Sequence, residues 1–76
     1  MDIFKKEKAL STKEKQQFSF LLNKGVTIKI IEASESLYFF HFIYKGKLLT
    51  YKYLDNLSPS QSEGMTSDII YEFDIK

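Results

Sequence analysis

The amino-acid sequence predicts an α+β fold in which one N-terminal helix packs on a four-stranded, mostly antiparallel β-sheet. Two observations lead to this prediction. Residues 37–54 contain two aromatic-rich runs of alternating residues on either side of Lys45-Gly46, which is the pattern of a β-hairpin. Residues 11–14 form a helix-start motif ahead of a segment with a single apolar stripe. Residues 1–76 are therefore expected to form one small domain.

The first ten residues are expected to form an N-terminal arm or a helical turn. Its large apolar residues are Ile3, Phe4 and Leu10, and lysines lie between them. Their spacing fits neither the period of a helix nor that of a strand. An amphipathic membrane anchor is not expected, because so few apolar residues would bury too little surface.

Residues 12–23 are expected to form the helix. Ser11 and Glu14 have the spacing of a capping box, in which each side chain accepts a hydrogen bond from the backbone N–H of the other residue. Gly25 can adopt the left-handed conformation that ends a helix. The apolar residues that share one helix face are Phe18, Leu21 and Leu22. A stripe of this width suits a helix that lies across a sheet.

The hairpin pattern also predicts a register. A two-residue turn at Lys45-Gly46, where Gly supplies a positive φ, pairs Phe42 with Leu49 and Phe40 with Tyr51. These pairs lie on one face of the sheet because side chains alternate along a strand. The same face is aromatic and aliphatic throughout, so it is expected to be the core face.

Residues 26–33 alternate and are rich in β-branched side chains, which predicts a strand before the hairpin. The loop that follows could contain two or three residues. A three-residue loop at 34–36 sets Ile28 opposite Phe42 and Ile30 opposite Phe40, and only this register places apolar residues together.

Residues 68–75 alternate as well and are expected to form the fourth strand. Its inward residues would be Ile69, Tyr71, Phe73 and Ile75, and its outward residues Ile70, Glu72 and Asp74. Residues 55–67 are expected to be a long flexible loop, which acts either as a mobile connector or as a binding loop. A helix start at Ser58 and Gln61 would end after one turn at Gly64.

The composition argues against most enzymatic chemistry. The chain has no Cys and a single His, His41, which excludes thiol triads, thiolate zinc sites and His-rich metal sites. Neighbouring carboxylates at Glu72 and Asp74 are interpreted as solubilising. No catalytic residue, no metal site and no cofactor is therefore expected, and the protein is predicted not to be an enzyme.

Charge is nearly balanced but unevenly distributed. All eleven basic residues are Lys, so the bidentate hydrogen bonds that Arg makes to phosphate or guanine cannot form. Residues 54–76 carry five acidic residues and one Lys, whereas residues 1–24 carry six Lys and three acidic residues. No apolar run approaches the 18 residues or so of a membrane span, and no signal peptide is recognised, so a cytoplasmic protein without a membrane partner is expected.

The second face of the predicted sheet is the candidate binding surface. It should present a mixture of apolar, aromatic and basic side chains, and the candidate partner-binding residues are Lys29, Ile31, Phe39, His41, Ile43, Leu48 and Lys52. A solvated face has no need of so many apolar residues, and apolar residues rimmed by polar ones mark an interaction site unless something covers them.

Three explanations for this face remain open at the sequence level. The N-terminal arm could cover it with Ile3, Phe4 and Leu10. A protein partner, including a second copy in a homodimer, could bind there. Single-stranded nucleic acid could stack on Phe39 and His41 while lysines hold its phosphates.

The sequence therefore favours a small non-enzymatic protein-binding module, with single-stranded nucleic-acid binding as the alternative. Short length, lysine-only basic character and an aromatic sheet are similar to small accessory proteins of phages and mobile elements. Many of these bind and block a host protein. The likeness is one of composition, and no motif carries it.

Overall fold

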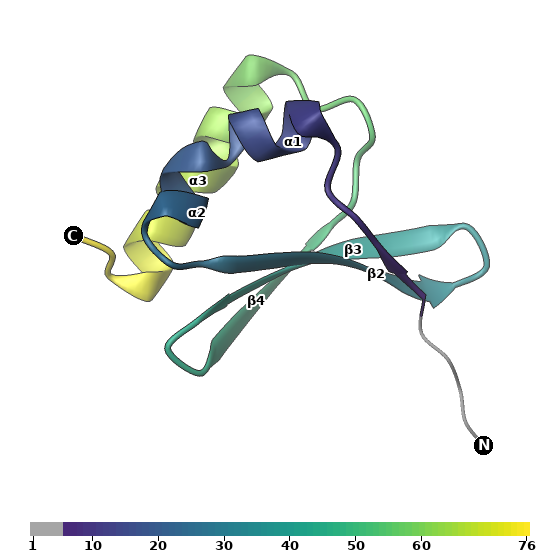
Figure 1. Ribbon diagram of the computed structural model, residues 1–76, viewed down its shortest axis with the longest axis horizontal. Helices are drawn as coiled ribbons and strands as arrows, with labels where there is room; N and C mark the ends of the chain where they lie inside the picture. Colours follow the sequence, from purple (N-terminus) through teal and green to yellow (C-terminus); the bar gives the residue numbers. More distant parts are fainter. Residues whose placement is uncertain (1–5) are drawn as a thin grey trace.

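The computed structural model describes residues 6–76 as a four-stranded antiparallel sheet with three helices on one of its faces (Figure 1). The elements, in chain order, are β1 (Glu7–Lys8), α1 (Thr12–Gln17), α2 (Ser19–Asn23), β2 (Thr27–Ser34), β3 (Leu37–Tyr44), β4 (Lys47–Lys52) and α3 (Pro59–Phe73). The strands are ordered β1-β2-β3-β4, so each pairs with its neighbour in sequence. The α+β class and the antiparallel sheet are thus confirmed.

The prediction of a fourth strand at residues 68–75 is wrong, because these residues belong mostly to α3. Ile69 and Phe73 are buried, as predicted, but they face the sheet as helix residues four positions apart. Tyr71, which a strand would turn inward, is 82% exposed. The fourth strand is instead β1, which comes from the N-terminal arm.

The segment expected to be a long loop contains the first half of α3. Ser58 and Gln61 form a capping box, with Ser58 Oγ accepting from Gln61 N at 3.2 Å and Ser58 N donating to Gln61 Oε1 at 2.8 Å. Gly64 does not end this helix. It lies on an open side where a Cβ would meet nothing, so it costs the helix only about 1 kcal/mol relative to Ala. The helix ends ten residues later, at Asp74 in the left-handed conformation.

The N-terminal helix begins as predicted but is broken in the middle. Ser11 Oγ accepts from Glu14 N at 3.1 Å, and Ser11 N donates to Glu14 Oε1 at 2.9 Å, which completes the capping box. The backbone leaves helical geometry at Phe18, where α1 ends and α2 follows. The Phe18 ring packs edge-on against Phe40 and Phe42, at centroid distances of 5.5 and 5.4 Å. Gly25, with φ of +91°, ends α2 as expected.

Both predicted hairpin registers are confirmed. Phe42 faces Leu49 across β3 and β4, and Ile28 faces Phe42 across β2 and β3. The β2–β3 connection differs in detail: a two-residue turn at Glu35-Ser36 is combined with a register shift between Glu32 and Ser34. The extra residue lies in a bulge rather than in the turn, so the pairing is the one that a three-residue loop would give.

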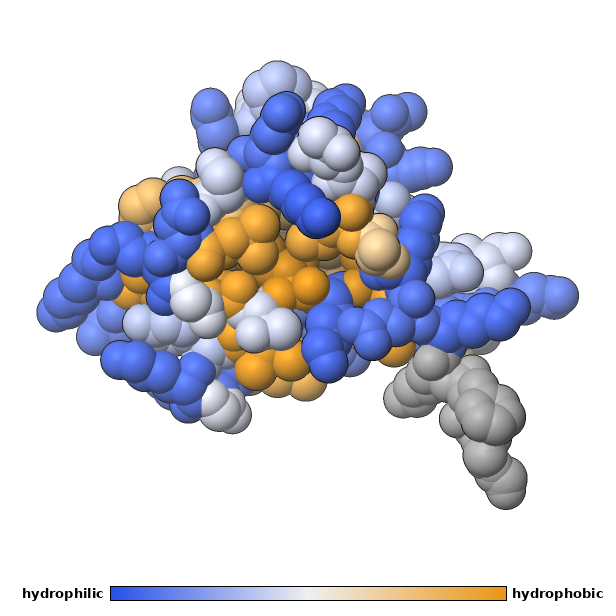
Figure 2. Space-filling model, in the orientation of Figure 1, coloured by the Kyte–Doolittle hydropathy of each residue, from blue (hydrophilic) through white to orange (hydrophobic). Residues whose placement is uncertain are grey.

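The core lies between the helices and one sheet face. Its buried hydrophobic residues are Phe18, Leu21, Val26, Ile28, Ile30, Phe40, Phe42, Leu57, Ile69, Phe73 and Ile75. Figure 2 shows hydrophobic side chains in the middle of the molecule, between the helix layer and the strands, with hydrophilic ones around them. Among the described residues, no helix is long and apolar enough to cross a membrane.

Candidate functional site

The sheet face opposite the helices, called the open face below, carries the predicted site. Side chains of directly paired residues lie on the same side of an antiparallel sheet. The open face therefore consists of three rows across the strands: Thr27, Ile43 and Leu48; Lys29, His41 and Thr50; and Glu7, Ile31, Phe39 and Lys52. All seven candidate partner-binding residues lie in these rows, so the structure brings them together.

The apolar residues of the open face form two groups. Ile43 and Leu48 are paired at one end, and Ile31 and Phe39 at the other, about 13 Å away along β3. The polar row that contains His41 separates them. Leu48 is 54% exposed, and the other three are only half-buried by their neighbours. The surface is therefore two apolar patches with a polar strip between them.

Three residues predicted on this face lie elsewhere. Ile70, Glu72 and Asp74 are part of α3 or its C-terminal cap, and α3 packs on the opposite side of the sheet. The correction matters for charge, because it takes two carboxylates away from the open face. Within the strands of residues 6–76, the charged side chains that remain on this face are Glu7, Lys29 and Lys52.

The N-terminal arm does not cover the open face with Leu10, because Leu10 packs against the core on the helix side. Ile3 and Phe4, the other two residues expected to provide this cover, lie outside the described residues. Within residues 6–76, Lys6, Glu7 and Lys8 extend the sheet sideways along the edge of β2.

The edges of β2 and β4 that face away from β3 differ from each other. Glu32 N donates to Lys6 O at 2.9 Å, so β1 closes the C-terminal half of the β2 edge. On the other side of the sheet, no strand within residues 6–76 pairs with the outer edge of β4. Tyr53 N donates to Tyr38 O at 3.0 Å, so these two residues form a hydrogen-bonded pair. Hydrogen-bonded and non-hydrogen-bonded pairs alternate along an antiparallel ladder, so Tyr51 and Leu49 also bond to β3. Leu48, Thr50 and Lys52 therefore direct their backbone N–H and C=O groups away from β3.

A polar cluster that sequence reasoning missed joins the start of the chain to the end of β4. Glu14 is only 6% exposed, and its Oε2 accepts a hydrogen bond from the Tyr53 hydroxyl at 2.8 Å. Lys8 Nζ lies 3.4 Å from that hydroxyl and 4.8 Å from the centre of the Tyr53 ring. Burial, together with the hydrogen bond to Glu14, raises the pKa of Tyr53 to about 12. Both Glu14 oxygens are hydrogen-bonded, so the cluster stabilises the fold.

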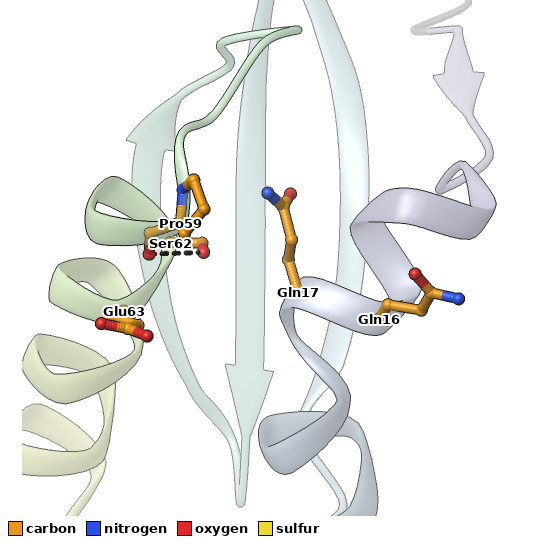
Figure 3. Close-up of a pocket in the computed structure, with 5 residues that line it drawn as sticks. All are labelled: Gln16, Gln17, Pro59, Ser62 and Glu63. Atoms are coloured by element: carbon orange, nitrogen blue, oxygen red, sulfur yellow. Dashed lines mark hydrogen bonds between the residues drawn. The ribbon is translucent and has the colours of Figure 1, made fainter.

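A shallow hollow of about 310 Å³ lies between α1 and the start of α3 (Figure 3). Its lining residues are Gln16, Gln17, Pro59, Ser62 and Glu63. The Ser62 hydroxyl donates to Pro59 O at 3.1 Å, and Gln17 Nε2 donates to Leu57 O at 3.0 Å. The first bond lies within α3, the second joins α1 to the segment ahead of α3, and Glu63 is the single carboxylate among the lining residues. The sequence did not indicate this hollow, because its two sides are about 40 residues apart.

Across the described part of the chain, no group of three or more His, Cys, Asp or Glu side chains is placed to hold a metal ion. Comparisons with protein families, with curated proteins and with solved structures give no match. The candidate site therefore rests on the open face and the β4 edge themselves.

Proposed function

We propose that this protein is a non-enzymatic protein-binding module whose partner docks on the open face. The observation that carries the proposal is the pair of apolar patches, Ile43 with Leu48 and Ile31 with Phe39, on a face that no helix within residues 6–76 covers. Burying each Å² of apolar surface contributes roughly 25 cal/mol. The large side chains of the two patches can supply apolar surface for burial by a partner. They lose little conformational freedom on binding, because the sheet already half-buries most of them.

The polar strip between the patches supplies the specific contacts of the proposed interface. His41 and Thr50 offer hydrogen-bonding groups, and Lys29 offers a charge at the strip's end. Interfaces typically combine apolar anchors with such polar groups. A protein of this kind acts by occupying a surface of its partner. That the partner is a host protein blocked by a phage or mobile-element product stays a prediction from composition.

Single-stranded nucleic acid is the second candidate, and one observation favours it. Glu72 and Asp74, which would repel phosphate on the open face, belong to the α3 side of the molecule. Phe39 and His41 could then stack bases, with Lys29 and Lys52 near the phosphates. The absence of Arg and the position of Glu7 beside Ile31 weigh against it.

The test is a double substitution on the open face, Phe39→Ser with Ile43→Ser. Both side chains lie outside the core, so the variant should fold, and circular dichroism verifies this. The matched control is Tyr71→Ser, which removes a large exposed side chain from α3. Each protein is used to capture partners from a bacterial lysate, with and without nuclease.

We expect the wild type and Tyr71→Ser to retain the same proteins, nuclease to have no effect, and the double variant to lose them. Retention by the double variant would contradict the proposal. Loss of the captured material on nuclease treatment would favour nucleic acid instead.

A further inference from the structure

The outer edge of β4 is a second feature with the chemistry of a binding site. Leu48, Thr50 and Lys52 each present one backbone donor and one backbone acceptor to this edge. A β-strand edge of this kind is a template for another strand, and proteins use it to bind extended peptides. The side chains of the same three residues lie on the open face, so the edge and the open face form one continuous surface.

The helix side of the same edge carries more negative than positive charge: Asp68 and Glu72 from α3, against Lys47, which pairs with Tyr44 and so shares the helix side of β4. Tyr51 points to the helix side of β4, and it packs against the core there. Ile69 and Phe73 are buried against the sheet, so Asp68 and Glu72, each one position earlier in α3, lie along one flank of the helix. After burial itself, the charges of these two carboxylates raise the pKa of Tyr51. Residues 59–73 contain no Lys, so nothing within α3 neutralises these carboxylates.

We propose that β4 takes up an extended segment of the partner protein as a fifth strand, and that this segment alternates basic with apolar residues. Its basic side chains would lie on the helix side, near Asp68 and Glu72. Its apolar side chains would lie on the open face, beside Leu48. The proposal rests on the protein-binding function above and states the chemistry of the partner.

The charges also argue for this occupant over a second copy of the chain. A two-fold pairing of β4 with β4 would place both α3 helices on the same side of the joined sheet. The four carboxylates of Asp68 and Glu72 would then gather on one side of the joined sheet with only the two copies of Lys47 from β4, which is unfavourable. A basic strand instead neutralises them.

The probe is a synthetic peptide of alternating lysine and valine, as long as the six residues of β4 and blocked at both ends. Two matched peptides serve as controls: one with glutamate in place of lysine, and one N-methylated on the amides that would face β4. Binding is followed by NMR chemical shifts and amide hydrogen exchange of the full chain.

We expect the lysine peptide to slow exchange at least tenfold at the amides of Leu48, Thr50 and Lys52. The amides of Leu49 and Tyr51 already bond to β3 and should not change. The glutamate peptide should bind at least tenfold more weakly, and the N-methylated peptide should not bind.

The matching change in the protein is Thr50→Pro. It removes one outward N–H, and the ladder to β3 stays intact because Thr50 and His41 form a non-hydrogen-bonded pair. It should weaken binding of the lysine peptide at least tenfold, whereas Thr50→Ser, which keeps both the backbone N–H and the hydroxyl, should bind like the wild type. Should the proline variant not fold, the N-methylated peptide tests the same hydrogen bonds from the other side.

Several results would overturn this inference: no binding of the lysine peptide, equal binding of the N-methylated or the glutamate peptide, or concentration-dependent protection of the Thr50 amide in the absence of peptide, which would identify a homodimer.

These outcomes can be distinguished from failure of the proposed function. A partner that is lost in the Phe39→Ser, Ile43→Ser variant but kept by Thr50→Pro would leave the function standing and remove the edge. A partner kept by the double variant and lost by Thr50→Pro would keep the β4 edge as a protein-binding site and remove the open face as the docking surface.

Discussion

The β2-β3-β4 part of the sheet has two edges, along β2 and along β4, and they meet their surroundings in opposite ways. Along β2, Lys6 and β1 satisfy the backbone at Ile30 and Glu32, and among residues 6–76 a short stretch around Ile28 is left without a neighbouring strand. Along β4, the whole outer edge is without a strand in the described part of the chain.

The difference shows that the chain pairs most of the β2 edge with its own N-terminal residues and leaves the β4 edge unpaired within residues 6–76. An uncovered edge invites pairing with other chains, and proteins usually blunt it with charges, bulges or prolines. β4 has Lys at both ends, Lys47 and Lys52, but its middle is regular and contains the exposed Leu48. The closed edge therefore stabilises the fold, and the open edge is the place where a partner strand fits.

The largest expected effect comes from a core substitution on β3, the strand that pairs with both β2 and β4. Phe42 is fully buried on β3, between β2 and β4, and Phe42→Ala should cost about 3–5 kcal/mol. A core of this size supplies roughly the same amount in total, so the variant should be largely unfolded. Urea denaturation followed by circular dichroism measures this. Phe39→Ala, on the open face of the same strand, should lose far less, and a cooperatively folded Phe42→Ala protein would contradict the assignment of the core.

The next effect concerns the link between the N-terminal residues and the end of β4. Tyr53→Phe leaves Glu14 Oε2 without its hydrogen-bond donor in a buried position, which should cost about 1–3 kcal/mol. A pH titration gives a second readout. Because the pKa of Tyr53 is raised to about 12 in the folded protein, its contribution is complete below the unfolded value near 10 and is lost as the pH rises from 10 to 12.

Wild-type unfolding free energy should therefore fall through this alkaline range, and Tyr53→Phe should show a smaller fall. Equal alkaline slopes for the two proteins would mean that the hydroxyl does not stabilise the fold in this way.

A third change should make the closed edge resemble the open one. The register turns the Lys8 backbone towards β2, so Lys8→Pro removes a ladder hydrogen bond at Ile30 and should cost about 1–2 kcal/mol. Hydrogen exchange at the Ile30 and Glu32 amides should accelerate. Glu7→Pro is the control. The backbone N–H of Glu7 points away from β2, so removing this N–H should leave the Ile30 and Glu32 amides protected. Unchanged exchange in Lys8→Pro would show that β1 does not protect the edge.

The smallest expected effect on stability separates the two candidate ligands. Replacing Lys29 and Lys52 by Gln changes half-buried or exposed side chains of the open face and should alter the unfolding free energy by about 0.5 kcal/mol or less. Binding to a protein partner should be nearly unchanged. Tight binding of the wild type to single-stranded DNA, with a salt slope that falls by about 1.4 on removal of the two lysines, would replace protein binding by nucleic-acid binding.

Local signals in the sequence determined a large part of this structure. The turn at Lys45-Gly46, the capping box at Ser11 and the glycine at Gly25 behave as predicted. The capping box at Ser58 also begins a helix as predicted, but that helix does not end at Gly64. Each depends on backbone conformations and hydrogen bonds within a few residues. The grouping of the seven candidate residues on one face followed from the same hairpin registers, since a strand alternates strictly between two faces.

The tertiary structure decided everything that depends on distant parts of the chain. Residues 68–75 fit both periods, because Ile69 and Phe73 lie on one face of a strand and also on one face of a helix. The capped start at Ser58 and the space on the sheet beside Phe18 and Phe42 favour the helix.

β1 has only two residues, too few to show a period, and it forms because β2 offers it an edge. The hydrogen bond between Glu14 and Tyr53 joins residues 39 positions apart. Such contacts have no local signature, because the free energy that selects them comes from burying and pairing groups that meet only when the chain has folded.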